Sequence, residues 1–381
     1  MSAADRLPSP TEGPRPRRVF EPVAVGGLTL RNRIVGSPVS TNMAEEDGTV
    51  TPEVLHFYTA MGRSGAGMVT IGATAVTAEG GSTANGMHIG ERRHAPGLRQ
   101  LAAAVKATGA AVSLQVFHVG AQGNSDYTGQ PVLGPSPYVC PGIGIEAREL
   151  TVAEIARIED GFADAVIAGL GYGFDFVELH VAHGYLLHQF LSPFFNRRTD
   201  AYGGSAENRL RILRNIADKI AARDGQAFRR VGARISGHDF QDDGLTITVN
   251  RPLVELFDAC GIAYWVVSAG VYETAKQKYV HMKLGDYWRY AGELKAITRA
   301  PVVAQGGIRT LRQGEAVLKA GQGDLIGMAQ ALIADPRLIE KTRAGEETRI
   351  SLCTECRRCR YIRRRDLSFD CLLPEGYHPP G

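Results

Sequence analysis

The sequence predicts an α/β fold in which eight parallel strands, each followed by a helix, close into a (β/α)8 barrel. Apolar runs of strand length recur eight times between helical segments, and they are almost continuously apolar, as strands buried on both faces are. The runs span residues 34–39, 68–76, 111–117, 174–181, 231–236, 264–268, 301–305 and 324–328. Such a barrel takes roughly 250 residues, so this chain of 381 residues accommodates it with insertions and terminal additions.

Apolar residues at helical spacing predict helices between these runs. The segments with this spacing are 98–108, 151–168, 206–223 and 311–319. Thr151, followed three positions later by Glu154, predicts a capping box at the start of the second helix. The segment 20–33 has Gly26 and Gly27 at a turn, which predicts a hairpin that caps the amino-terminal end of the barrel.

The two ends of the chain differ in composition from the barrel. Residues 1–18 contain four prolines and four arginines and are predicted to be a disordered tail, followed by the barrel over residues 19–345. Residues 346–381 form a short extension rich in cysteine and arginine. Four of the six cysteines lie between positions 353 and 371, which favours a ligand set over a dispersed disulfide framework.

Composition argues against several classes of function. Hydrophobic residues make up 44% of the chain, enough for a sizeable core, and a net charge of +3 is too small to indicate nucleic acid or a membrane as a general partner. We find no run of 18 apolar residues and no hydrophobic segment among the first 18 residues, so neither a membrane span nor a secretory signal is expected. The default expectation is a cytoplasmic location.

Polar side chains follow the fourth strand run at its carboxyl end, where barrels of this kind carry their active sites. His180, His183 and Tyr185 lie within six residues there. Two imidazoles can donate hydrogen bonds to a developing negative charge, and a phenol can deliver a proton. A metal site built on the two histidines is an alternative, and so is a purely structural role.

Other strand ends add an amide, a guanidinium and hydroxyl groups to the same rim. Two glycine-containing turns at the ends of the last two strands could hold a phosphate through backbone N–H groups. The segments 120–150 and 271–288 are long enough to determine substrate specificity. The aromatic residues that could wall a substrate pocket there are Tyr127, Tyr138, Tyr272, Tyr279 and Trp288.

The string HGYLLHQFLSPFFNRRTDAYGGSAENRLR, residues 183–211, closely resembles the old yellow enzyme family of flavin-dependent reductases. Within that family it is similar to the branch that includes 2,4-dienoyl-CoA reductase and trimethylamine dehydrogenase. Supporting matches are LRNRIVGSPVST, GATAV, LQVFHVG, VGARIS, VAQGGI and LIADP. The resemblance extends over nearly all of residues 20–336 and implies a TIM barrel.

The resemblance implies that FMN binds across the carboxyl-terminal mouth of the barrel. Residues at several strand ends would line the isoalloxazine, namely Pro38, Val39, Ser40 and Ala73. Gln115 would hydrogen-bond its pyrimidine end and Arg234 would lie against N1 and O2. The phosphate would lie on Gly306, Gly307, Ala329 and Gln330. The family commonly has an arginine at the position of Gln330, so weaker FMN retention is expected here.

The activity that the resemblance implies is reduction of an alkene conjugated to a carbonyl group, with NAD(P)H as the hydride source. His180 and His183 would hold the carbonyl oxygen of this small-molecule substrate, and Tyr185 would deliver the proton. A second possibility is oxidation of an amine or related substrate, with electrons leaving through a cluster. A flavin-free metal hydrolase or binding protein on the same barrel is the alternative from another class. The family often associates, so a homo-oligomer is possible.

The cysteine pattern Cys353-x2-Cys356-x2-Cys359-x11-Cys371 resembles the ligand spacing of iron-sulfur members of this branch, which implies a 4Fe–4S cluster. Structural zinc and unligated thiols are the alternatives. Arginines interleave with these cysteines and could dock an acidic redox partner or a phosphate-bearing substrate, or could form a solvated face. They are Arg357, Arg358, Arg360, Arg363, Arg364 and Arg365.

Overall fold

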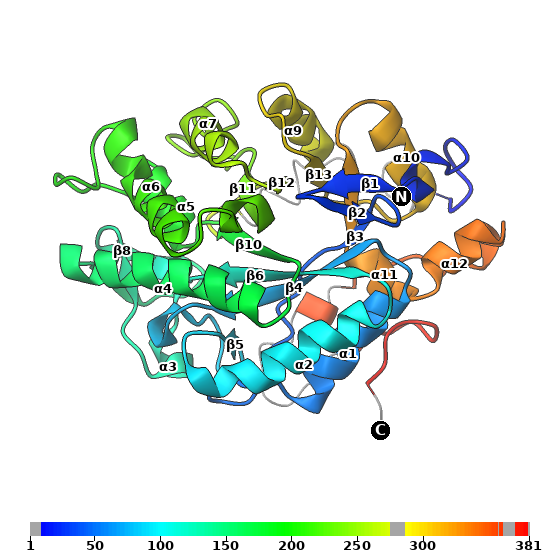
Figure 1. Cartoon of the computed structure of the whole chain (residues 1–381), viewed down its shortest axis with the longest axis horizontal. Helices are drawn as coiled ribbons and strands as arrows, with labels where there is room; N and C mark the ends of the chain where they lie inside the picture. Colours follow the sequence, from blue (N-terminus) through cyan, green and yellow to red (C-terminus); the bar gives the residue numbers. More distant parts are fainter. Residues whose placement is uncertain (1–8, 275–285, 357, 361–369, 380–381) are drawn as a thin grey trace.

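The structure is a computed structural model, and it describes residues 9–274, 286–356, 358–360 and 370–379. Its centre is a closed barrel of eight parallel strands surrounded by helices (Figure 1). The barrel strands are β3 (Ile34–Gly36), β4 (Met68–Ala75), β6 (Ala111–Phe117), β10 (Phe176–Val181), β11 (Val231–Ser236), β12 (Tyr264–Ser268), β13 (Val302–Gln305) and β14 (Leu325–Met328). Pairing of β14 with β3 and of β3 with β4 closes the ring, which confirms the predicted fold class.

Helices alternate with the barrel strands along the chain. The helices are α1 (Pro52–Arg63), α2 (Ala95–Lys106), α3 (Ser125–Thr128), α4 (Val152–Gly171), α5 (Leu186–Leu191), α6 (Ala206–Arg223), α7 (Arg251–Cys260), α9 (Asp286–Lys295), α10 (Leu311–Lys319), α11 (Gln330–Ala334) and α12 (Leu338–Arg343). All four predicted helices are present within a few residues of their expected bounds. At the start of α4, the Thr151 hydroxyl accepts from the Glu154 N–H at 3.2 Å, and the Glu154 carboxylate accepts from the Thr151 N–H at 2.8 Å. The predicted capping box is therefore confirmed.

The amino-terminal hairpin closes one end of the barrel. It consists of β1 (Val23–Val25) and β2 (Leu28–Leu30), paired antiparallel around Gly26 and Gly27, which both have positive φ. Val25 and Leu30 join a core cluster that includes Phe176, Tyr264 and Leu325. These three residues begin strands β10, β12 and β14, so the hairpin lies at the amino-terminal ends of the strands, as predicted.

The segment 120–150 contains small elements at the opposite end of the barrel. The strands β7 (Leu133–Gly134), β8 (Tyr138–Val139) and β9 (Glu146–Glu149) form a separate three-stranded sheet there. Outside this segment, the short strand β5 (Met87–His88) pairs with β4 at the edge of the barrel sheet. The Tyr138 hydroxyl donates to Glu273 at 2.7 Å. Because Glu273 follows the carboxyl end of β12, this contact ties the small sheet to the mouth of the barrel.

Both terminal segments contact the barrel where they are described. The backbone N–H groups of Arg17 and Val19 donate to Glu315 on α10, at 3.0 and 3.1 Å. At the other end, the Tyr377 N–H donates to the Ile333 carbonyl of α11 at 2.8 Å. Residues 1–8, the central part of the segment 271–288 with Tyr279, and Arg357, Arg363, Arg364 and Arg365 lie outside the described residues. No helix in the described parts of the chain is long and apolar enough to cross a membrane.

Removing hydrophobic contact at the hairpin cap should destabilise the barrel. Leu30 is 2% exposed, so we expect Leu30→Ala to lower the free energy of unfolding by about 2–5 kcal/mol, through lost burial and a residual cavity. Leu28→Ala is the matched control, since Leu28 lies on the same hairpin and is 39% exposed. Denaturant titration measures both variants. Equal effects would show that the hairpin is not anchored in the core.

Candidate functional site at the barrel mouth

His180, His183 and Tyr185 lie together at the carboxyl end of β10. His183 Nδ1 is 3.2 Å from His180 Nε2, and the Tyr185 ring centroid is 4.8 Å from that of His180. His183 adopts a positive φ of 62°, and its N–H donates to the Ser236 hydroxyl at 3.2 Å. The Tyr185 and Tyr272 hydroxyls are 3.5 Å apart. The structure thus brings the three predicted catalytic residues into one cluster and adds Tyr272 beside them.

Burial and one backbone hydrogen bond define the protonation state of His180. Burial lowers the pKa of His180 well below its usual value, and the nearby Arg234 and His188 lower it further. His180 Nδ1 accepts from the Ala182 N–H at 3.3 Å, so the proton of the neutral ring lies on Nε2 and points to His183 Nδ1. His183 Nε2 lies 2.6 Å from the Ser268 hydroxyl. The two rings and Ser268 therefore form one hydrogen-bonded chain.

A buried polar network lies behind these histidines. Arg234 on β11 approaches Glu178 on β10, with 3.7 Å between Nε and Oε1, and donates to Gln305 on β13 at 2.7 Å. Gln115 on β6 donates to the same Glu178 oxygen at 2.6 Å, and the Ser37 hydroxyl donates to Gln305 at 3.1 Å. Burial raises the pKa of Glu178, and the Arg234 charge opposes that rise. The network holds the Arg234 guanidinium in one place.

Residues at the ends of β3 and β4 are held together by one phenol. The Tyr58 hydroxyl on α1 lies 2.7 Å from the Val39 carbonyl and 2.8 Å from the Gly72 carbonyl, and it accepts from the Gly72 N–H at 3.0 Å. A Cβ on Gly72 would come within 2.7 Å of Pro38 and 2.9 Å of the Gln115 amide oxygen. Pro38, Gly72 and Gln115 are therefore neighbours at the mouth, and only a residue without a side chain fits between them.

The predicted phosphate residues lie on two adjacent strand ends. Gly306 and Gly307 follow β13, Ala329 and Gln330 follow β14, and these strands pair through Gln305 and Gly327. Gly306 has a φ of 101°, and a Cβ there would lie 2.4 Å from the Tyr287 ring, so glycine is required on both grounds. The Trp288 indole N–H donates to the Gly306 carbonyl at 2.9 Å. The turn that carries the glycines is thus closely fixed.

These residues fit a bound FMN. Arg234 Nε is buried, lies 3.7 Å from the Glu178 carboxylate, and makes no hydrogen bond to any residue that the structure describes. Gly306 and Gly307 follow β13, Ala329 and Gln330 follow the neighbouring strand β14, and Ser40 and Ala73 are accessible at the mouth. Arg234, Gln115 and the two turns would hold the pyrimidine and phosphate ends of the cofactor. FMN would supply hydride transfer chemistry at this position.

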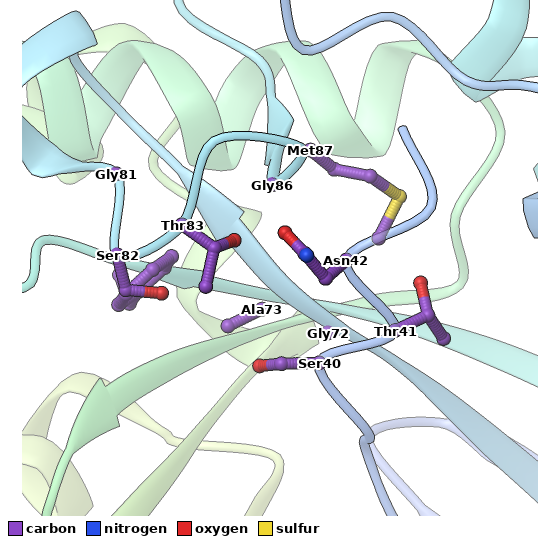
Figure 2. Close-up of a pocket in the computed structure, with 11 residues that line it drawn as sticks. Ser40, Thr41, Asn42, Gly72, Ala73, Gly81, Ser82, Thr83, Gly86 and Met87 are labelled. Atoms are coloured by element: carbon purple, nitrogen blue, oxygen red, sulfur yellow. The ribbon is translucent and has the colours of Figure 1, made fainter. Parts of the chain in front are cut away.

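A small pocket opens beside these residues, between the segment that follows β3 and the loop that joins β4 to β5 (Figure 2). Its lining includes Ser40 and Ala73, which were predicted, and Asn42, Ser82 and Thr83, which were not. The sequence offered no signal for the last three, because they become neighbours only in the fold. Glu178 was also missed, although a glutamate in the middle of an apolar strand marks a buried polar contact.

The four cysteines of the predicted ligand set face one pocket beside α11. Cys353, Cys356, Cys359 and Cys371 line it together with Gln330. Burial raises the pKa of Cys359 to about 11, with a further contribution from the other three cysteines, and the Gln330 side chain hydrogen-bonds this thiol. Within the described residues, however, no group of three or more His, Cys, Asp or Glu side chains is arranged to hold a metal ion.

The closed barrel and its polar mouth are typical of a barrel enzyme. A sequence model of the NADH:flavin oxidoreductase / NADH oxidase family matches residues 18–349. The chain therefore belongs to this family, which is the old yellow enzyme family, and the resemblance seen in its sequence is confirmed.

Relatives and solved structures agree with the family. The chain is 34% identical to an NADH oxidase of Thermoanaerobacter brockii, over 89% of this chain and 52% of that protein. It is 33% identical to an NADPH dehydrogenase of Geobacillus thermodenitrificans, over 84% and 91% of the two chains. A solved 2-naphthoyl-CoA reductase matches with a TM-score of 0.83 and 26% identity, over 89% of this chain and 54% of that one. An old yellow enzyme homologue from Zymomonas mobilis matches with a TM-score of 0.76 and 26% identity, over 86% and 93%.

The chain spans about half the length of the first curated relatives it matches. Flavin and NAD(P)H are the cofactors that membership of the family implies.

The low pKa of His180 can be tested directly. Because the folded-state pKa lies below the unfolded value of about 6.5, the unfolded chain binds this proton first, and the stability that His180 contributes is lost as the pH falls below that value. We expect the ¹⁵N shifts of its ring to report the neutral Nε2–H form at pH values at which the denatured reference is already protonated. The denatured protein is the reference, and His180→Gln assigns the signal. Titration of the folded signal near the reference value would contradict this prediction.

Proposed function

We propose that this protein is an FMN-dependent ene reductase that uses NAD(P)H to reduce the C=C bond of an α,β-unsaturated carbonyl compound. The observation that carries the proposal is the hydrogen-bonded chain of His180, His183 and Ser268, with Tyr185 beside it, at the mouth of a flavin-family barrel. When bound, FMN would deliver hydride to the alkene carbon distant from the carbonyl group. Side chains of this protein would bind the substrate oxygen and donate the proton.

The histidines would hold the substrate oxygen. Hydride addition places negative charge on that oxygen, and a donor fixed in a pocket from which water is excluded opposes it more strongly than water does. Neutral His180 adds no positive charge next to Arg234, and its Nε2–H, now directed at His183 Nδ1, would turn to the substrate oxygen. The Tyr185 hydroxyl would give its proton to the other alkene carbon, with the Tyr272 hydroxyl adjacent to it.

Arg234 would act on the cofactor side of the site. Its guanidinium is held between Glu178 and Gln305, and it would present a fixed cation to the pyrimidine end of the flavin. The arrangement favours alkene reduction over a metal hydrolase built on His180 and His183, because no third ligand joins them to form a metal site among the described residues.

His180→Ala should leave FMN bound and lower kcat/KM for 2-cyclohexenone by about 10²–10³, the usual cost of losing one oxyanion donor. The wild-type protein should be yellow and release FMN on denaturation. The flavin is first reduced anaerobically with NADPH or NADH. Stopped-flow measurement of its reoxidation by the enone then isolates the transfer of hydride to the alkene. His378→Ala, at an exposed histidine, is the matched control. Full turnover in the His180 variant would remove this residue from its proposed role.

We propose as a second point that Cys353, Cys356, Cys359 and Cys371 would hold a 4Fe–4S cluster, which would supply one-electron transfer chemistry when bound. Support comes from the spacing of the four thiols and from the one pocket they face. The raised pKa of Cys359 means that its thiol is protonated when no metal is bound, so metal binding would release that proton.

Metal analysis of protein purified without oxygen separates the alternatives for the cysteines. A cluster predicts about four iron and four sulfide per chain, whereas zinc predicts about one metal ion and no sulfide. Cys356→Ser should abolish the metal content, and Cys260→Ser is the control because Cys260 lies on α7, away from the extension. A protein that binds neither iron nor zinc after reconstitution would leave the thiols unligated and refute the cluster.

A further inference from the structure

The pocket of Figure 2 is built from hydroxyl and amide side chains. Ser40 and Asn42 come from the segment after β3, and Ser82 and Thr83 come from the loop between β4 and β5. In Figure 2 the side chains of Asn42 and Thr83 point toward each other across the pocket. Met87 and Phe117 supply its apolar lining.

Both walls are fixed by hydrogen bonds from several elements. The Asn85 N–H donates to the Asn42 side-chain oxygen at 3.1 Å, and the Ala44 N–H donates to the Asn85 carbonyl at 3.0 Å. On the other side of the loop, the Val119 N–H donates to the Gly80 carbonyl at 2.9 Å. The polar groups are therefore held in position before any ligand arrives, which reduces the entropy lost on binding.

The pocket carries polarity without formal charge. None of the described residues that line it is acidic or basic. His88 packs behind Gly81, and burial lowers its pKa to about 4, so this imidazole is neutral at pH 7. A carboxylate or ammonium group in the pocket would lose hydration without gaining a counter-charge, whereas a neutral hydroxyl could both donate to and accept from the serine and threonine hydroxyls.

The position of the pocket connects it to the reaction. Ser40 and Ala73 line the pocket and are also two of the residues proposed to line the flavin. A substrate held against the flavin could therefore place a substituent between Asn42 and Thr83.

We propose that Asn42, Ser82 and Thr83 form a specificity subsite that binds a neutral hydroxyl substituent of the substrate. This inference rests on the proposed ene reductase function and adds the substrate class, a hydroxylated α,β-unsaturated carbonyl compound. It places specificity on the β4–β5 loop, in addition to the segments 120–150 and 271–288.

Steady-state kinetics with three kinds of cyclohexenone tests the subsite: unsubstituted, each ring hydroxy isomer, and a carboxylate-substituted ring. The wild type should prefer one hydroxy isomer over the unsubstituted ring and should disfavour the carboxylate. Thr83→Val keeps the side-chain shape and removes the hydroxyl, and we expect it to lower the preference ratio, in kcat/KM, about 3- to 10-fold, the range for one hydrogen bond. Ser82→Ala should act in the same direction.

Two further variants separate chemistry from packing. Thr83→Ser keeps the hydroxyl and should retain the preference, while Thr248→Val makes the same substitution at an exposed site and should change nothing. Flavin content of each variant shows that the fold is intact. If the wild type reduces enones without preferring a hydroxy isomer, or if Thr83→Val leaves the ratio unchanged, the subsite is wrong and the proposed function stands. If no enone is reduced, the proposed function fails and the subsite fails with it.

Discussion

The contact between Arg234 and Glu178 is the constraint on which the site depends. Two buried charges lose most of their hydration, so they are tolerated only where each has an opposite charge and enough hydrogen bonds. Here Glu178 accepts from Gln115 and Tyr264, and Arg234 donates to Gln305, which also accepts from Ser37. These residues lie on β6, β10, β11, β12 and β13, and directly after β3. Satisfying one buried pair therefore fixes the relative positions of most strands that carry site residues.

The barrel itself could be predicted because short stretches of adjacent residues specify its strands, helices and turns. Strands buried on both faces read as continuous apolar runs, and the hairpin and the α4 capping box are specified by a few adjacent residues. The order of the elements then leaves little choice of topology. The cluster of His180, His183 and Tyr185 was equally accessible, because a strand end and the following turn hold all three within six positions.

Contacts between distant segments could not be read in the same way. Ser268, the acceptor for His183, lies 85 positions further along the chain, and Tyr58 reaches the ends of two strands from a helix. Nothing in the sequence near His183 or Val39 indicates these partners. The hydroxyl-lined pocket is a stronger example, since Asn42 and Thr83 are both ordinary loop residues in sequence. Their meaning comes from the hydrogen bonds that fix the β4–β5 loop, and those form only when the barrel closes.

Charge is divided across the mouth in a way that suits one reaction type. Arg234 is a permanent cation, and its field is one reason why His180 stays neutral. A positive charge on His180 would repel the Arg234 guanidinium. With His180 neutral, the site offers a cation on one side, uncharged donors on the other, and an uncharged polar pocket beside them. A substrate that is neutral when it binds and gains negative charge only as it reacts is stabilised most by this arrangement, because fixed donors then interact more strongly with the transition state than with the ground state.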